Sequence, residues 1–247
     1  MLLAVPLLNP TLLLRRSTSS IFLFWVPLAA QWLMMASEGP FLAAIIARLG
    51  EPRFNLAAYG VAFAIAILIE SPVIMLMSAS AALVEDRAAY RKLRNFMYGL
   101  NALSTGLLVL VLVPPVYRLL TDTLLRLPEE VASLTYGALW ILLPWPAAIG
   151  YRRFLHGLLI RSGRTRLVAL GTLVRLGAMS ATAVISYVFF NLPGAWVGAA
   201  SLSIAVCVEA CVARLMTKNT IREIVAHEPP RRTEGEGLGY RGIAHFY

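Results

Sequence analysis

Charged residues are scarce in this chain: they make up 14% of its 247 residues, whereas hydrophobic residues make up 59%. A soluble domain is about one quarter charged and about half apolar, so the composition argues against a soluble protein. Several runs reach the length of about 20 mostly apolar residues that a helix needs to cross the ~30 Å hydrocarbon core of a bilayer. The sequence therefore predicts a multi-pass protein surrounded by membrane lipid, and we expect it in the cytoplasmic (inner) membrane of the cell.

Cysteine and histidine are also rare, with two and three copies. Cys207 and Cys211 lie one helical turn apart in an apolar run, which provides neither a disulfide framework nor the about four ligands of a structural zinc site. His156, His227 and His245 are expected in or near loops, and the sequence contains no HExxH or GxSxG motif. We therefore expect no enzyme, no catalytic residue, no metal site and no bound cofactor.

Six apolar runs predict an all-α membrane protein with six transmembrane helices, since the alternating pattern of barrel strands is absent. The predicted spans cover residues 21–47, 56–84, 96–117, 131–151, 167–190 and 194–215. They form one predicted bundle, residues 21–216. Residues 1–20 are interpreted as an interfacial leader and not as a signal peptide, because Arg15 and Arg16 follow its apolar stretch instead of preceding it.

The net charge of +9 might be taken as a sign of nucleic-acid binding, but the basic residues lie between apolar runs. Arginine and lysine are concentrated before the first predicted span and after the second, fourth and sixth, while the alternate loops hold few. Cytoplasmic loops of membrane proteins carry such an excess. The pattern predicts that both termini are cytoplasmic and that nucleic acid is not a partner.

The last residues of the sequence suggest a repeat. Residues 217–241 form a predicted cytoplasmic linker rich in proline and glycine. Residues 242–247 then turn aromatic and apolar, as the entrance to the first span does. We interpret them as the start of a truncated second repeat, which would supply a second six-helix lobe in the same orientation. The alternatives are that the second lobe is another chain or a second copy of this one.

Ionisable side chains at membrane depth cost about 2.5–3.5 kcal/mol on insertion scales and are functional candidates for that reason. The sequence places four of them within predicted spans: Glu38, Glu70, Arg175 and Glu209. Arg175 and Glu209 lie at similar depth in consecutive antiparallel spans, so we predict that they are partners. The pair is either structural or part of a substrate cavity, with Arg175 holding an anionic group.

Glu38 has no obvious basic partner at its depth, and Pro40 follows it by two residues. Glu70 and Pro72 repeat this arrangement. Proline removes a backbone donor and kinks a helix, and transporters place ion sites beside broken helices. We therefore predict Glu38 and Glu70 as one ion-coupling site for H⁺ or Na⁺, with both prolines as gating hinges. The alternatives are a permanently protonated Glu38 bonded to a neighbouring helix, and a Glu70 that belongs only to a hinge.

Two amides complete the predicted lining of a substrate cavity with Arg175 and Glu209. Gln31 lies on the same face of the first span as Glu38, and Asn101 belongs to a mildly polar strip of the third span. Small polar residues also mediate helix packing, which is the alternative reading of Asn101.

Several stretches resemble one transporter family. VPLAAQWLMMASEGPFLAAIIARLG, followed by NLAAYGVAFAI, resembles the first two helices of the multidrug and toxic compound extrusion (MATE) transporters and the wider multidrug–oligosaccharidyl-lipid–polysaccharide flippase superfamily. RRFLHGLLIRSGRTRLVALGTLVRLG resembles the segment between the family's fourth and fifth helices. EGP together with HG-L-L is similar to the progressive ankylosis branch, associated with export of small anions. The resemblance runs from about Val26 to Lys218.

The resemblance implies twelve helices in two six-helix lobes around a central cavity, of which this chain supplies the N-terminal lobe. It also implies that Glu38 occupies the place of the family's acidic coupling residue, where H⁺ or Na⁺ bends the first helix. Two features depart from the multidrug branch: the residue is Glu and not the usual Asp, and Arg175 is not a general feature.

These patterns together predict a cation-coupled exporter or antiporter for a small organic molecule or anion, with a small-molecule substrate and a second lobe as partners. The alternative within transport is a lipid-linked saccharide flippase. The alternative of another class is a non-transporting membrane scaffold or assembly partner, in which the buried charges only pair helices.

Overall fold

A computed structural model describes residues 18–226 and 239–246 of the chain. All regular elements in these two ranges are helices, in agreement with the predicted fold class. In chain order they are α2 (Thr18–Ile46), α3 (Pro52–Ile74), α4 (Leu76–Leu83), α5 (Arg87–Leu112), α6 (Pro114–Arg118), the π-helical turn η1 (Leu119–Leu124), α7 (Glu129–Ile141), α8 (Trp145–Arg161), α9 (Thr165–Phe189), α10 (Gly194–Ala226) and α11 (Tyr240–Phe246).

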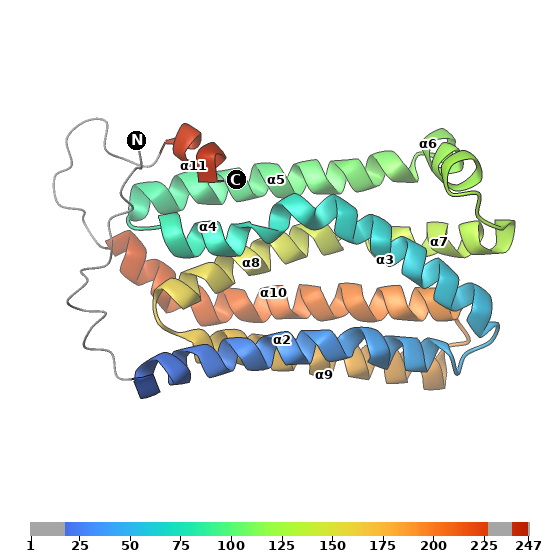
Figure 1. Cartoon of the computed structure of the whole chain (residues 1–247), viewed down its shortest axis with the longest axis horizontal. Coiled ribbons are helices and arrows are strands. Elements are labelled where there is room, and N and C mark those ends of the chain that lie inside the picture. The colour runs from blue at the N-terminus through green and yellow to red at the C-terminus, as the bar shows by residue number, and fades with distance from the viewer. Residues whose placement is uncertain (1–17, 227–238, 247) are drawn as a thin grey trace.

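Length and hydropathy single out four stretches that could cross a membrane: residues 52–83, 87–112, 165–189 and 194–226. The pair α7 and α8 meets the same criteria as one span bent by 44°. The structure thus supports a protein with four or five apolar spanning helices. Helix α2, with 29 residues, runs beside them (Figure 1), and the sixth span stays a prediction.

The long helices run up and down in one elongated bundle (Figure 1). Helix α10 is its centre, since 61% of its most apolar window is buried and it packs against α9, α8, α7, α3 and α2. Helices α2 and α9 lie side by side along one edge of the bundle. Helix α8 fits between α10 and the layer of α4 and α5.

Basic connections gather at one end of the bundle. The α4–α5 connection, the α8–α9 turn and the end of α10 lie at the same end as the start of α2 (Figure 1). These are the segments in which the sequence concentrates arginine and lysine. The alternation predicted from the charges therefore matches the two ends of the bundle. The assignment of this basic end to the cytoplasm stays a prediction.

The boundary of the fourth span differs most from the sequence prediction. The prediction ended it at residue 151, whereas α8 continues to Arg161. Arg152, Arg153 and His156 therefore lie inside the bundle and not in a cytoplasmic loop, and the prediction that His156 lies in or near a loop is wrong. The apolar residues between and after these polar ones keep α8 packed on its neighbours: Phe154, Leu155, Leu158 and Leu159 are all buried.

The two predicted hinges behave differently. Pro40 lies within α2, which continues without a break to Ile46, so the expected interruption beside Glu38 is not present. Pro72 lies near the end of α3, and the helix is interrupted at Met75 before α4 begins. A further break, at the 44° bend between α7 and α8, was not predicted, although Pro144 lies in it.

The chain beyond the sixth predicted span is more helical than expected. Residues 217–226 continue α10, so that part of the predicted linker is helix, while residues 227–238 lie outside the described residues. Residues 240–246 form the short helix α11, which packs on α4 with Ile243 fully buried. Its interpretation as the start of a second repeat stays a prediction.

Candidate functional site

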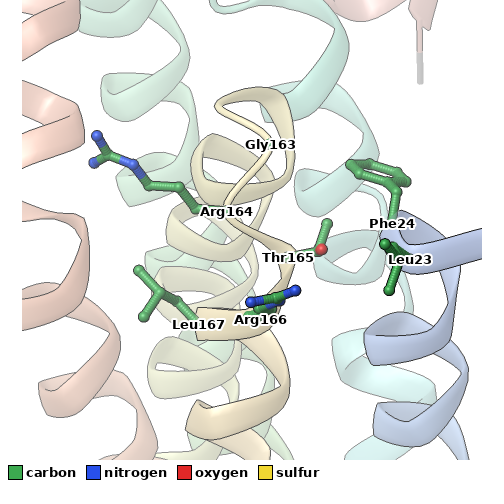
Figure 2. A pocket seen from close by; sticks show the side chains of 7 residues that line it. All are labelled: Leu23, Phe24, Gly163, Arg164, Thr165, Arg166 and Leu167. Atoms are coloured by element: carbon green, nitrogen blue, oxygen red, sulfur yellow. The ribbon is translucent and has the colours of Figure 1, made fainter. Parts of the chain in front are cut away.

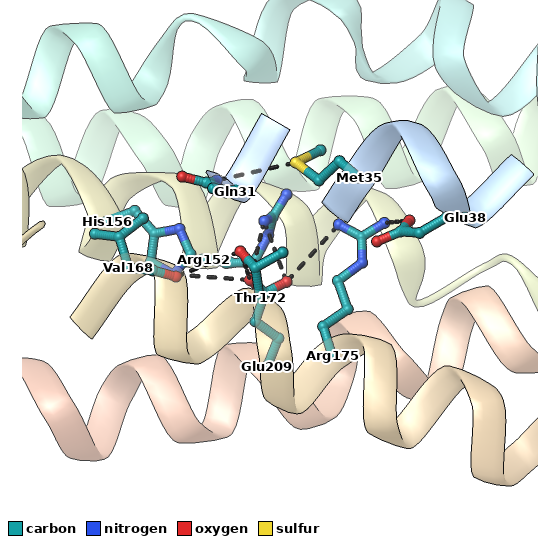
Figure 3. Close-up of polar contacts among 9 residues, drawn as sticks. All are labelled: Gln31, Met35, Glu38, Arg152, His156, Val168, Thr172, Arg175 and Glu209. Carbon is teal, nitrogen blue, oxygen red and sulfur yellow. Dashed lines mark hydrogen bonds and ion pairs between the residues drawn. The ribbon is translucent and has the colours of Figure 1, made fainter. Parts of the chain in front are cut away.

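Four helices bring five ionisable side chains together in the middle of the bundle (Figure 3). They are Glu38 of α2, Arg152 and His156 of α8, Arg175 of α9 and Glu209 of α10, and we call them the buried charge cluster. All five are at most 6% exposed. Arg175 lies ten residues after the start of α9, or ~15 Å along the helix axis at ~1.5 Å per residue, so the cluster is far from either end.

Glu38 pairs with Arg175. The Nη2 atom of Arg175 donates a hydrogen bond to Oε2 of Glu38 at 2.5 Å, and the two side chains are 7% and 4% exposed. The expectation that Glu38 lacks a basic partner is therefore wrong. It failed because Arg175 comes from α9, the helix that lies beside α2, and no local pattern in either helix reveals that neighbour.

Glu209 is the shared acid of the cluster. Its Oε2 lies 3.1 Å from Nη1 of Arg152 and 3.8 Å from Nη1 of Arg175. The predicted Arg175–Glu209 contact is thus present, but it is the longer of the two contacts made by Arg175. Thr172 donates to Oε1 of Glu209 at 3.4 Å, and Nε2 of His156 lies 3.9 Å from the same oxygen.

Helical spacing explains how each helix presents its polar residues to this point. Arg152 and His156 are four residues apart in α8, and Thr172 and Arg175 are three apart in α9, spacings that put side chains on one face of a helix. Sequence reasoning missed Arg152 and His156 because arginines after an apolar run were taken for a loop. The signal that would have found them is the run FLHGLLI, which is too apolar to be a loop.

Formal charges in the cluster balance when His156 is neutral. Two acids, Glu38 and Glu209, face two arginines, Arg152 and Arg175. Burying single charges costs several kcal/mol each, so ions in an apolar bundle are normally paired and hydrogen-bonded. The charges of this cluster are paired, because each acid contacts an arginine.

Glu70 makes no direct contact with Glu38, and their predicted role as one ion-coupling site stays a prediction. Glu70 is buried, with 4% exposure, but it shares no hydrogen bond or ion pair with Glu38, whose carboxylate contacts Arg175 instead. Arg153 and Arg152 of α8 lie near enough to interact with the charge of Glu70. Arg153 is 9% exposed and, within the described residues, forms no ion pair within 4.0 Å. Glu70 and Arg153 therefore extend the polar interior toward α3 without direct contact.

The two predicted amides lie in different places. Gln31 is 5% exposed and is on α2 beside the cluster (Figure 3), where its Nε2 contacts the sulfur of Met35 at 3.9 Å. Asn101 of α5 donates instead to the carbonyl of Ala147 at 3.1 Å, close to the break between α7 and α8. This contact is the packing role that was the alternative reading of Asn101.

The cluster has hydrogen-bonding capacity that the described residues do not use. Buried polar atoms are normally hydrogen-bonded. Six in the cluster have no hydrogen-bond partner among the residues that the structure describes: Glu38 Oε1, Arg152 Nε, His156 Nδ1, Arg175 Nε, Arg175 Nη1 and Glu209 Oε2. Within the same residues, no group of three or more His, Cys, Asp or Glu side chains could hold a metal ion. The cluster therefore consists of paired charges with unused hydrogen-bonding capacity.

Two cavities lie away from the cluster. One, of about 540 Å³, is between the start of α2 and the α8–α9 turn (Figure 2). The other, of about 870 Å³, lies at the opposite end of the bundle between α6, η1 and α7, lined by Tyr117, Asp122 and Glu129 among others.

Comparison of the chain with protein-family models, with curated proteins and with solved structures finds no match. The resemblance to the multidrug and toxic compound extrusion transporters therefore stays an expectation drawn from the sequence alone.

Proposed function

We propose that this chain is one lobe of a secondary active transporter, an exporter or antiporter that couples H⁺ or Na⁺ to the movement of a small organic molecule or anion across the cytoplasmic membrane. The observation that carries the proposal is the buried pair of Glu38 and Arg175 between α2 and α9. A second lobe, from a downstream segment or another copy, would complete the substrate cavity.

A buried ion pair is an energetically unfavourable way to join two membrane helices. Replacing a buried ion pair by apolar side chains is often neutral or stabilising by about 1–4 kcal/mol, and apolar residues are abundant in both helices. Pairing helices alone therefore gives little reason for Glu38 and Arg175 to be ionisable. A group that must gain and lose charge during a cycle does give such a reason.

Competition for Glu38 would supply the coupling. Binding of H⁺ or Na⁺ to the Glu38 carboxylate cancels its charge and weakens its attraction for Arg175. The guanidinium would then turn toward Glu209, whose carboxylate is already 3.8 Å from Arg175, or toward an anionic group of the substrate. A ligand shifts an equilibrium only by binding two states differently. The cation would favour the state in which the pair is open, and the paired state would favour release of the cation.

One observation favours the lipid-linked saccharide flippase as a second candidate. Arg152, Arg153 and Arg175 are all buried in the same bundle, and Arg153 makes no ion pair within 4.0 Å in the described part of the chain. Arginines of this kind suit a pyrophosphate head group, because a guanidinium donates two parallel hydrogen bonds to phosphate oxygens. A flippase would act on the lipid-linked substrate and not on a soluble anion.

Gradient-driven uptake into inside-out membrane vesicles tests the proposal. The vesicles are loaded to be acidic or rich in Na⁺ inside, and uptake of a cationic dye (ethidium) and of a radiolabelled organic anion (citrate) is measured. We expect uptake above that of vesicles lacking the chain, and we expect Glu38→Gln to abolish the part that depends on the gradient. Glu129→Gln is the matched control, since Glu129 is exposed at the start of α7.

The outcomes separate the candidates. Equal gradient-driven uptake in wild type and Glu38→Gln would exclude Glu38 as the coupling group. If no gradient drives uptake, movement of a fluorescent lipid-linked saccharide between leaflets is measured in the same vesicles, and activity there would favour the flippase. Absence of both activities would favour the non-transporting scaffold.

A further inference from the structure

The cavity of about 540 Å³ at the basic end of the bundle is lined by apolar side chains on one side and polar ones on the other (Figure 2). Leu23 and Phe24 of α2 form its apolar side, and residues 163–167 of the α8–α9 turn and of the start of α9 form its polar side. One cavity therefore combines a basic, hydroxyl-bearing wall with a wall of apolar side chains.

The two arginines of the polar wall have different roles. Arg164 is held by α10: it donates to the Thr220 hydroxyl at 2.7 Å and to the Glu223 carboxylate at 2.8 Å. Arg166 is exposed and, within the described residues, forms no hydrogen bond or ion pair. Its charge is thus available to a ligand, whereas the charge of Arg164 is already compensated.

Thr165 contributes a hydroxyl to the polar wall of the cavity. This residue is 3% exposed and is the first residue of α9. In Figure 2 the oxygen of Thr165 is directed to the side of the cavity where Leu23 and Phe24 lie. The hydroxyl is therefore placed to donate a hydrogen bond to a molecule in the cavity.

In the predicted membrane orientation, the apolar wall would lie at the level where lipid head groups meet acyl chains. Leu23 is 59% exposed, and its neighbours Phe22 and Trp25 are 61% and 59% exposed. All three lie in the first turns of α2, at the basic end of the bundle. Aromatic side chains concentrate at this level in membrane proteins, and basic pockets between helices on the cytoplasmic side bind anionic head groups.

We propose that this cavity binds the head group of an anionic membrane phospholipid, with Arg166 and Thr165 contacting the phosphate and with Leu23 and Phe24 contacting the adjoining acyl chain. A phosphate oxygen accepts from both a guanidinium and a hydroxyl. Free phosphate would use the polar wall but leave the apolar wall uncovered, which favours the lipid.

The site connects the same two helices that carry the buried charge pair. Leu23 and Phe24 lie in α2 with Glu38, and Thr165 and Arg166 lie in α9 with Arg175. A bound lipid would therefore hold the basic ends of α2 and α9 together. The inference does not depend on transport, since it concerns a lipid site at the surface of the bundle.

Native mass spectrometry of the full chain, released from detergent after mixing with phosphatidylglycerol, tests the site. We expect Arg166→Gln to bind about fivefold less of this lipid, because one arginine near an anionic surface contributes about that factor. Arg166→Lys keeps the charge and should retain most of the binding, and Thr165→Val should weaken it. Arg87→Gln, an exposed arginine at the same end of the bundle, should bind as wild type does.

Three results would overturn the proposal. The first is equal binding of phosphatidylglycerol by wild type and Arg166→Gln. The second is an equal loss in Arg87→Gln, which would show a general effect of surface charge. The third is displacement of the lipid by inorganic phosphate, or equal binding of zwitterionic phosphatidylcholine, which would show that the anionic lipid is not the ligand. Thermal unfolding of each variant in detergent verifies that it is folded.

Discussion

Glu38 and Arg175 are 137 positions apart in the sequence, yet Nη2 of Arg175 lies 2.5 Å from Oε2 of Glu38 in the interior of the bundle. Arg175 is also 3.8 Å from Glu209, so one guanidinium is placed between two acids of different helices. The two partners of the pair differ in whether they can lose their charge. A carboxylate can be neutralised by a proton, whereas a guanidinium stays charged.

This inequality predicts different costs for the two single substitutions. Glu38→Gln leaves Arg175 and Arg152 to share Glu209, with one positive charge uncompensated, and should lower the free energy of unfolding by about 3–5 kcal/mol. Arg175→Gln leaves Glu38, which can take up a proton, and should cost less. The double variant removes both charges and should be more stable than Glu38→Gln alone.

Thermal unfolding of the four proteins in detergent, followed by tryptophan fluorescence, measures this cycle. Because the two residues are in direct contact, their effects should not add. Additive losses in the double variant would contradict a direct interaction between Glu38 and Arg175.

Glu209 should be the least replaceable acid of the chain. Its carboxylate contacts Arg152 and Arg175 and lies 3.9 Å from His156, and the residue is fully buried. Glu209→Gln leaves two arginines with one acid, so we expect a loss of about 3–5 kcal/mol or failure to accumulate in the membrane. Glu223→Gln is the control, since Glu223 is 58% exposed and a surface pair with Arg164 contributes about 0–1 kcal/mol.

Expression level and thermal unfolding of the two variants are compared side by side. Equal stability of Glu209→Gln and Glu223→Gln would contradict the role of Glu209 as the shared acid of the cluster.

The membrane class and the positions of most long helices follow from the sequence, because they depend on hydropathy along a continuous segment. The fifth predicted span, residues 167–190, differs by one or two residues from α9, Thr165–Phe189. The start of the third is less accurate: residue 96 was predicted, but α5 begins at Arg87, where the Asp86 side chain caps it by accepting from the Ala89 N–H at 2.7 Å. Hydropathy does not detect such a cap, so a prediction based on hydropathy missed the start of α5.

Only part of the site could be predicted, because the pairing of its residues does not depend on hydropathy. Glu38, Arg175 and Glu209 stand out because each interrupts an apolar run, but the pairing between them depends on which helices are neighbours. Arg152 lies near the point where a loop was expected, and a basic residue there is the usual sign of a cytoplasmic loop. The tertiary contact with Glu209 at 3.1 Å is what makes a buried arginine tolerable at that position, and a single sequence does not display it.

Close packing of α8 on α4 depends on Gly157. A Cβ atom built at this position would overlap the Ser80 side chain and the Met77 carbonyl. Gly157→Ala should therefore push the two helices apart and cost about 1–3 kcal/mol, as overpacking does in other interiors. Gly177 in α9 has no atom within 4 Å of a built Cβ, so Gly177→Ala should be neutral or stabilising through its better helix propensity.

Thermal unfolding distinguishes these two alanine variants under identical conditions. A Gly157→Ala protein as stable as Gly177→Ala would contradict the close approach of α8 and α4.

The predicted orientation assigns the two ends of the bundle to opposite sides of the membrane. Cysteine labelling tests it in a background in which Cys207 and Cys211, both in α10, are replaced by alanine. Ser162 lies at the basic end, after α8, and Thr123 is exposed in η1 at the other end. If basic connections remain cytoplasmic, a membrane-impermeant maleimide should label Ser162→Cys only in inside-out vesicles and Thr123→Cys only in right-side-out vesicles.

The labelling pattern separates two parts of this prediction. Labelling of both positions from the same side would contradict a bundle that crosses the membrane between them. The reverse pattern would preserve the crossing but place the basic end outside, against the charge rule. In that case the lipid site at Arg166 would face the outer leaflet, and Glu38 would lie nearer the cytoplasmic than the outer end of α2, because only eight residues separate it from Ile46.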